Sequence, residues 1–112
     1  MTIRVKKYLV DAQMAASAIS DFLKGKTRDD YFNSLLLRSG VERQFEIIGE
    51  ALKQASQEKE DLELDIPELW KIVGLRNRII HGYDSIDGDS LWDLTQVELP
   101  LLEKDLAVLI SA

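Results

Sequence analysis

Residues 37–57, LRSGVERQFEIIGEALKQASQ, decide the fold class. At about 100° per residue, the apolar side chains fall on one face and the polar side chains on the other, as in an amphipathic helix. The apolar face holds Leu37, Val41, Phe45, Ile48, Leu52 and Ala55, and the polar face holds Arg43, Glu46, Glu50 and Gln54. With Thr27 and Asp30 as a capping pair, the sequence predicts a helix over about residues 27–57, with a weak point at Gly40.

Three further segments show helical signals. Apolar residues recur at threes and fours over residues 2–24, and Gly25 supplies the stop. Pro67 favours the first turn of a helix over residues 67–83, PELWKIVGLRNRIIHGY. A fourth helix is expected over residues 89–111, with a kink at Pro100. The acidic stretch 57–65, QEKEDLELD, has no apolar period and predicts a loop.

The composition fits one soluble helical domain. The β-branched runs are short and no twofold alternation persists, so strands have little to build on. We therefore expect residues 1–112 to form a single domain, an all-α antiparallel bundle of four or five helices. No apolar run approaches the roughly 20 residues that span a bilayer. We expect a cytoplasmic protein with no membrane contact.

The rare residue types limit the chemistry. The chain has no cysteine and one histidine, His81, which argues against zinc fingers, iron–sulfur clusters and thiol nucleophiles. We expect no metal and no cofactor. The net charge of −6, from 14 basic and 20 acidic residues, disfavours broad nonspecific binding to nucleic acid. An RNA site would have to be local, built from a few cations in a cleft.

Arg76 stands in the middle of the apolar stripe of the third predicted helix. A guanidinium in such a place needs an anionic or carbonyl partner, and Glu46 and Glu50 are natural candidates. Tyr83 returns to within about 20° of Arg76 on a regular helix, whereas His81 lies about 140° away, on the flank of Asn77 and Trp70. Arg76 and His81 would therefore meet through the long reach of the arginine or across a symmetric boundary between two subunits.

Each of these residues also has a purely structural interpretation. His81 fits a packed or solvated histidine, Arg76 fits a buried ion-pair partner, and Tyr83 fits a packing residue with its hydroxyl in water. The turn over residues 84–89 lacks the calcium-loop spacing, and its aspartates fit caps of the next helix. Periodicity alone leaves the structural and the functional interpretations open.

Several strings resemble one family. The segment Arg76-Asn77-Arg78-Ile79-Ile80-His81-Gly82-Tyr83 resembles the R-x(4–6)-H-x-Y signature of the HEPN superfamily, in its HepT-like ribonuclease toxin branch. WKIVGLRN at 70–77, FEIIGEAL at 45–52, and Trp92 followed by Leu99-Pro100 are similar to the same branch. The resemblance runs in order along nearly the whole chain.

The resemblance implies a metal-independent endoribonuclease that forms a homodimer, with the two signature helices facing each other across the two-fold. Arg76 and His81 would be the catalytic pair, Asn77 would orient them, and Tyr83 would receive AMP. An MNT-type nucleotidyltransferase antitoxin would transfer that AMP and silence the toxin, as in type VII toxin–antitoxin systems. The substrate class is RNA, with tRNA and mRNA both open.

The chemistry of these residues supports that role independently. RNA carries its own nucleophile, the 2′-hydroxyl, so cleavage needs a group that moves a proton and a cation that meets the charge on the phosphate. His81 suits the first task and Arg76 the second, giving a 2′,3′-cyclic phosphate. Arg78 and Lys71 are candidate RNA contacts if a two-fold gathers them with Arg76. The alternatives are a catalytically silent helical subunit of a nucleotidyltransferase complex and a ribonuclease without such a partner.

Overall fold

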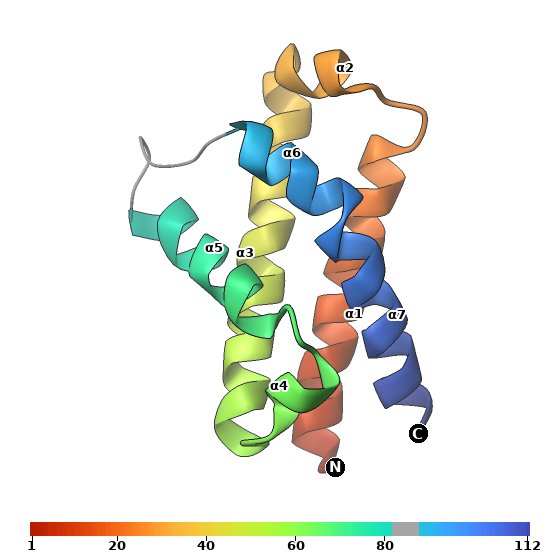
Figure 1. Ribbon diagram of the computed structural model, residues 1–112, viewed down its shortest axis with the longest axis vertical. Helices are drawn as coiled ribbons and strands as arrows, with labels where there is room; N and C mark the ends of the chain where they lie inside the picture. Colours follow the sequence, from red (N-terminus) through yellow and green to blue (C-terminus); the bar gives the residue numbers. More distant parts are fainter. Residues whose placement is uncertain (82–87) are drawn as a thin grey trace.

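An antiparallel pair of long helices, α1 and α3, forms the centre of the fold, and α5 packs on the far side of α3 (Figure 1). The computed structural model describes residues 1–81 and 88–112, apart from the side chains of residues 80, 81, 88 and 89. This part of the chain is helical throughout, in the order α1 (Ile3–Leu23), α2 (Arg28–Phe32), α3 (Leu35–Glu58), α4 (Leu62–Asp65), α5 (Leu69–His81), α6 (Gly88–Gln96) and α7 (Glu98–Ser111). The all-α prediction is confirmed.

The first predicted helix agrees closely with α1. Its N-terminus is capped by the Thr2 side chain, which accepts a hydrogen bond from the Val5 amide at 3.1 Å. The chain leaves the helix through Gly25, whose φ of 74° lies in the left-handed region that glycine adopts without strain. The buried face consists of Val5, Leu9, Ala12, Ala15, Ala16 and Ile19, which follow the predicted spacing.

The second predicted helix is divided, and the break lies at Asn33 and Ser34 instead of Gly40. The predicted capping pair is present, because Thr27 and Asp30 exchange hydrogen bonds of 2.9 and 3.1 Å at the start of α2. Ser34 then caps α3 by accepting from the Leu37 amide at 3.1 Å. The break lets α2 fold over the end of the bundle, where Tyr31 is fully buried.

Two other boundaries differ from the prediction. The stretch 57–65 is not simply a loop: α3 extends to Glu58, and a single turn, α4, follows. That turn forms because Leu62 and Ile66, four residues apart, are both fully buried. The predicted fourth helix is divided at Val97 into α6 and α7. Pro100 in the first turn of α7 is the cause, because its ring excludes a continuous helix through the carbonyl of Gln96. These divisions give seven helices in the described residues, where four or five were expected.

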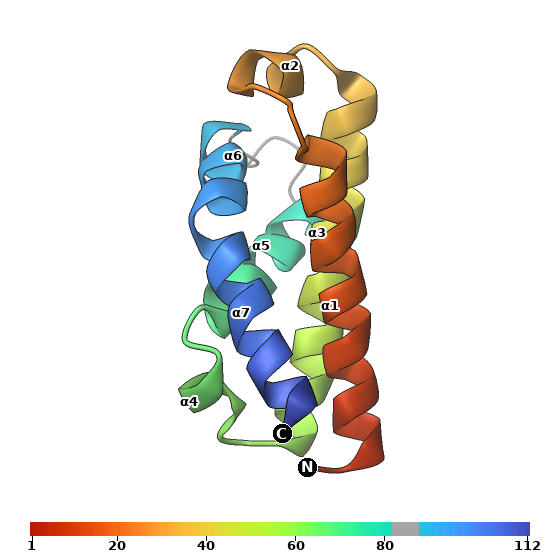
Figure 2. The same ribbon diagram turned by 90° about the vertical axis from the view of Figure 1, so that its right-hand side faces the viewer.

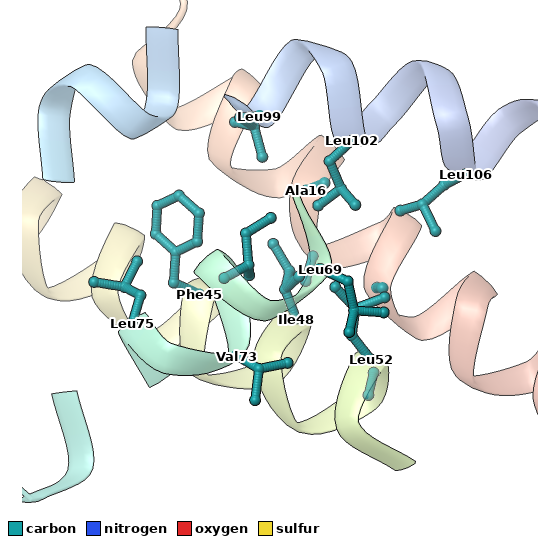
Figure 3. Packing of buried hydrophobic residues seen from close by; sticks show 14 of the residues in the cluster. Ala16, Phe45, Ile48, Leu52, Leu69, Val73, Leu75, Leu99, Leu102 and Leu106 are labelled. Atoms are coloured by element: carbon teal, nitrogen blue, oxygen red, sulfur yellow. The ribbon is translucent and has the colours of Figure 1, made fainter. Parts of the chain in front are cut away.

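The core fixes α5 against the rest of the bundle. Figure 3 shows side chains of three helices packed around Ala16 of α1. They are Phe45, Ile48 and Leu52 of α3, Leu69, Val73 and Leu75 of α5, and Leu99, Leu102 and Leu106 of α7. The second view shows α7 running beside α1, with both chain ends at the same end of the molecule (Figure 2). Among the described helices, none is long and apolar enough to cross a membrane. Because α5 is anchored in this way, the side chains along it have defined positions.

Candidate functional site

Arg76 lies on the buried side of α5, as its place in the apolar stripe predicted. Its neighbours on that side, Leu69, Ile72, Val73 and Ile79, are buried, and the Arg76 side chain itself is 19% exposed. A guanidinium keeps its charge under these conditions, so it needs partners that offset the loss of water. The two nearest partners come from α3 and from α5 itself.

The guanidinium of Arg76 is held at both of its terminal nitrogens. Nη2 lies 2.7 Å from Oε2 of Glu50 on α3, and Nη1 donates a hydrogen bond of 2.9 Å to Oδ1 of Asn77. Of the two predicted carboxylate partners, Glu50 is therefore the one that pairs with Arg76. Glu46 instead pairs with Arg43, one turn earlier on α3, at 2.9 Å. Asn77, for which an orienting role was predicted, thus contacts Arg76 directly, and the role itself stays a prediction.

Gly49 is the reason that Arg76 can lie so close to α3. A Cβ atom placed on Gly49 would lie 2.8 Å from Cγ of Arg76 and closer still to its Cβ. Carbon atoms in contact prefer about 3.5–4.0 Å, so no larger residue fits without displacing α5. We missed Gly49 in the sequence. Its signal was a glycine inside a strongly amphipathic helix, which often marks a close approach of two backbones.

A groove of about 650 Å³ lies beside Arg76. Its lining includes all four residues of the polar face predicted for α3, namely Arg43, Glu46, Glu50 and Gln54, together with Tyr8, Asp11 and Met14 of α1. Three carboxylates (Asp11, Glu46 and Glu50) and two guanidiniums (Arg43 and Arg76) line it. Arg76 thus faces a groove that carries charges of both signs among apolar side chains, not a positive cleft.

Lys71 and Arg78, the other predicted RNA contacts, line a different hollow. This smaller hollow of about 320 Å³ lies between α5 and the α6–α7 segment, and Lys71 forms an ion pair there with Glu98. Arg78 is two residues from Arg76, which places it on the other side of a helix. One chain by itself does not bring these three cations to a single site.

The flank of α5 that leads to His81 is open to solvent. Trp70 is 54% exposed, with its indole N–H donating to Glu63 at 2.6 Å, and Asn77 is exposed. Between them, a Cβ placed on Gly74 would meet no atom within 4 Å. His81 is the last residue of α5 and its backbone continues this flank. The His81 side chain, Tyr83 and the turn over residues 84–87 lie outside the described residues.

The described side chains offer no group of three or more histidines, cysteines, aspartates or glutamates placed to hold a metal. Two described groups have strongly raised pKa values, Tyr31 in the core and Glu68, and only the carboxyl of Glu68 shifts toward neutral pH. Burial raises the pKa of Glu68, at the start of α5, to about 7, and the nearby carboxylates of Asp105 and Glu98 add to the effect. The raised pKa of Glu68 thus belongs to the packing of α5 beside Asp105 and Glu98 of α7, apart from the groove that Arg76 lines.

Together, the bundle and this site define a class of protein. The all-helical architecture and the R-x4-H motif on α5 fit a HEPN-type helical bundle. The family model "Ribonuclease HepT-like" matches residues 12–109. The chain belongs to the HepT-like ribonuclease family.

Relatives of this chain bear ribonuclease names. It is 32% identical over 105 residues to a Methanocaldococcus jannaschii protein named "Putative RNase MJ1380", covering 93% of this chain and 94% of that one. It is 30% identical over 99 residues to "Probable ribonuclease HepT" of Thermococcus cleftensis, covering 88% of both. It also matches, at 33% identity, 46% of the longer M. jannaschii protein "Gamma-glutamylcyclotransferase and putative RNase MJ0434". No solved structure matches the chain.

Proposed function

We propose that this chain is a metal-independent endoribonuclease in which Arg76 and His81 form the catalytic pair. The family and the ribonuclease names of the relatives support RNA as the substrate. The observation that carries the proposal is the setting of Arg76, a charged group seated in an apolar interface, oriented by two partners and open on one side to a groove.

The reaction needs little beyond this pair. The 2′-oxygen of one nucleotide bonds to the adjacent phosphorus while the bond from phosphorus to the 5′-oxygen breaks. An imidazole takes the 2′-proton, and an imidazolium gives a proton to the leaving 5′-oxygen. An imidazole, with an ordinary pKa of about 6.5, can do either at neutral pH. The Arg76 guanidinium meets the negative charge that grows on the phosphate oxygens.

We further propose that the active form is a homodimer acting in the cytoplasm. Arg76 points toward α3, while His81 ends the opposite, exposed flank of the same helix. For the pair to act together, a two-fold would have to bring the His81 flank of one subunit to the groove beside Arg76 of the other. The exposed Trp70 and Asn77 on that flank fit a surface that a second chain or RNA covers.

The biological role that we propose is that of a type VII toxin. Tyr83 follows His81 by two residues, so AMP on its hydroxyl would add bulk and a phosphodiester beside the catalytic pair. The bound phosphodiester would compete with RNA for Arg76. An MNT-type nucleotidyltransferase antitoxin would carry out this transfer from ATP.

The ribonuclease proposal is tested with the purified chain and single-stranded RNA in the presence of EDTA. We expect cleavage that leaves 2′,3′-cyclic phosphate and 5′-hydroxyl ends, and no cleavage where the 2′-hydroxyl is replaced by hydrogen. Arg76→Ala and His81→Ala should abolish cleavage and relieve growth arrest on expression. Arg4→Ala is the matched control, because Arg4 also pairs with a glutamate of α3, Glu58, at 3.2 Å. Undiminished cleavage by both site variants would contradict the proposal.

The toxin proposal has a separate test. Incubation with an MNT-type nucleotidyltransferase, ATP and Mg²⁺ should add the mass of AMP to the native chain and leave Tyr83→Phe unmodified. An unmodified native chain that still cleaves RNA would favour a ribonuclease without such a partner.

One observation favours the alternative of a catalytically silent subunit. The ion pair between Arg76 and Glu50 is also what a purely structural arginine would form. A chain that binds the nucleotidyltransferase but cuts no RNA would establish that alternative.

A further inference from the structure

The α3 segment Gly49–Glu50 meets Arg76 with two consecutive residues. Gly49 lets the Arg76 stem rest against the α3 backbone, and Glu50 contacts the guanidinium at 2.7 Å. The first residue sets how near α5 approaches, and the second sets where the charged group points. We infer that Glu50 is a positioning residue for the reaction, acting through Arg76; this inference rests on the proposed ribonuclease function.

The two tethers restrain the guanidinium as a rigid plane. A guanidinium has five N–H donors in a fixed fork, and here one partner contacts each terminal nitrogen. Glu50 comes from α3 and Asn77 from α5, so the plane is fixed relative to both helices. The remaining N–H donors therefore have fixed directions before a phosphate arrives. Less conformational entropy of the Arg76 side chain is lost when a phosphate contacts them.

The contact with Glu50 is the stronger of the two tethers. It is an ion pair between a carboxylate oxygen and a guanidinium nitrogen 2.7 Å apart, so two full opposite charges attract each other, whereas Asn77 offers only the dipole of a neutral amide. The other carboxylate oxygen of Glu50, Oε1, accepts a hydrogen bond of 2.9 Å from the Gln54 amide on the same helix, which holds the carboxylate in place beside Arg76. Loss of the Glu50 contact leaves Asn77 alone to hold the guanidinium.

Glu50 also has an opposing electrostatic effect. Its negative charge lies beside the cation that would meet the phosphate, so it weakens the attraction of Arg76 for RNA in the ground state. A positioning role therefore predicts opposite changes in the two kinetic constants when the charge is removed. The value of kcat falls because Arg76 is less well ordered, whereas KM stays constant or falls because a repelling charge is gone.

The control for Glu50 is present on the same helix. Glu58 of α3 also pairs with an arginine of a neighbouring helix, Arg4 of α1, and it lies outside the groove beside Arg76. Glu58→Gln removes the same charge and the same type of ion pair. A general effect of net charge or of fold stability should therefore appear in both variants.

The experiment compares Glu50→Gln, Glu50→Ala and Glu58→Gln with the native chain, using one single-stranded RNA and temperatures well below each unfolding midpoint. We expect kcat to fall about tenfold in Glu50→Gln and further in Glu50→Ala, with KM constant or lower, and native values in Glu58→Gln. The inference is overturned if kcat in Glu50→Gln equals or exceeds the native value while the native chain cleaves RNA.

A spectroscopic measurement tests the restraint without relying on activity. In ¹⁵N NMR of the arginine side chains, the restrained Arg76 should show separate signals for its two terminal nitrogens, because rotation of the guanidinium is slow. We expect these signals to merge in Glu50→Ala and to persist in Glu58→Gln. Separate signals that persist in Glu50→Ala would overturn the inference. An inactive native chain with restrained Arg76 would refute the ribonuclease proposal and leave Glu50 as a tether alone.

Discussion

Replacement of Gly49 by alanine tests the close approach of α3 and α5 that seats Arg76. The added methyl would lie 2.8 Å from Cγ of Arg76 and closer still to its Cβ, about 1 Å short of normal carbon contact. The clash is with the stem of Arg76 next to the backbone, and the guanidinium is held by Glu50 and Asn77, so the side chain cannot simply rotate away. The two helices must separate.

The expected cost follows from two opposing effects. Overpacking of a close interface typically costs about 1–3 kcal/mol. Alanine in a helix interior is more favourable than glycine by about 1 kcal/mol, which offsets part of that cost. We therefore expect Gly49→Ala to lower the free energy of unfolding by about 1 kcal/mol. For a domain of this size, the corresponding decrease in Tm is about 4 °C.

Gly74→Ala is the matched control for this substitution. Gly74 lies inside α5, and a Cβ there would meet no atom within 4 Å, so only the gain in helix propensity remains. Urea unfolding of the two variants should give changes of opposite sign, with Gly74→Ala more stable than the native chain by up to about 1 kcal/mol. If Gly49→Ala is as stabilising as Gly74→Ala, the close approach that we describe at Arg76 is wrong.

Two further substitutions test the caps and the buried acid. Ser34→Ala removes the side-chain acceptor for the Leu37 amide at the start of α3 and should lower the free energy of unfolding by about 1 kcal/mol; an unchanged urea midpoint would show that this cap contributes nothing. Glu68 has its pKa raised to about 7, so its stabilising contribution is complete below the unfolded value of 4.5 and is lost as pH rises through 7. The free energy of unfolding of Glu68→Gln should therefore equal that of the native chain at pH 4.5. At pH 8 it should be higher by about 1 kcal/mol, after allowance for solvent screening. Stability curves that stay parallel from pH 4.5 to 8 would contradict the raised pKa of Glu68.

The sequence predicted well where burial follows the helical period. The apolar residues expected on the second helix, from Val41 to Ala55, form the buried face of α3, because a helix that packs on two neighbours must keep one face apolar. The sequence predicted the helix ends less well, because contacts with other helices decide where a helix ends. Gly40 is tolerated inside α3 because the Phe22 ring packs over it, at 3.3 Å from where a Cβ would lie. The actual break at Asn33 and Ser34 lets Tyr31 reach the core.

The candidate site shows the same division between local and tertiary information. An arginine in an apolar stripe predicted an ion-pair partner, and the sequence offered two candidates, Glu46 and Glu50. Only the crossing of α3 and α5 selects Glu50, because that crossing turns Glu50 toward Arg76 and leaves Glu46 to Arg43. The role of Gly49 depends on the same crossing, and no feature of a single helix specifies where its neighbour crosses it.

The separation of the cations bears on how an acidic chain would act on RNA. Arg76 faces a groove with three carboxylates, while Lys71 and Arg78 line another hollow in which Lys71 pairs with Glu98. In one chain, therefore, the three predicted RNA-contacting cations are not gathered on one surface that would attract a polyanion. The proposed activity then depends on the orientation of a few donors more than on long-range attraction, and it needs residues from two chains to meet at one phosphate. The restraint of Arg76 by Glu50 and Asn77 is therefore more important for the proposed activity than the net charge of the chain.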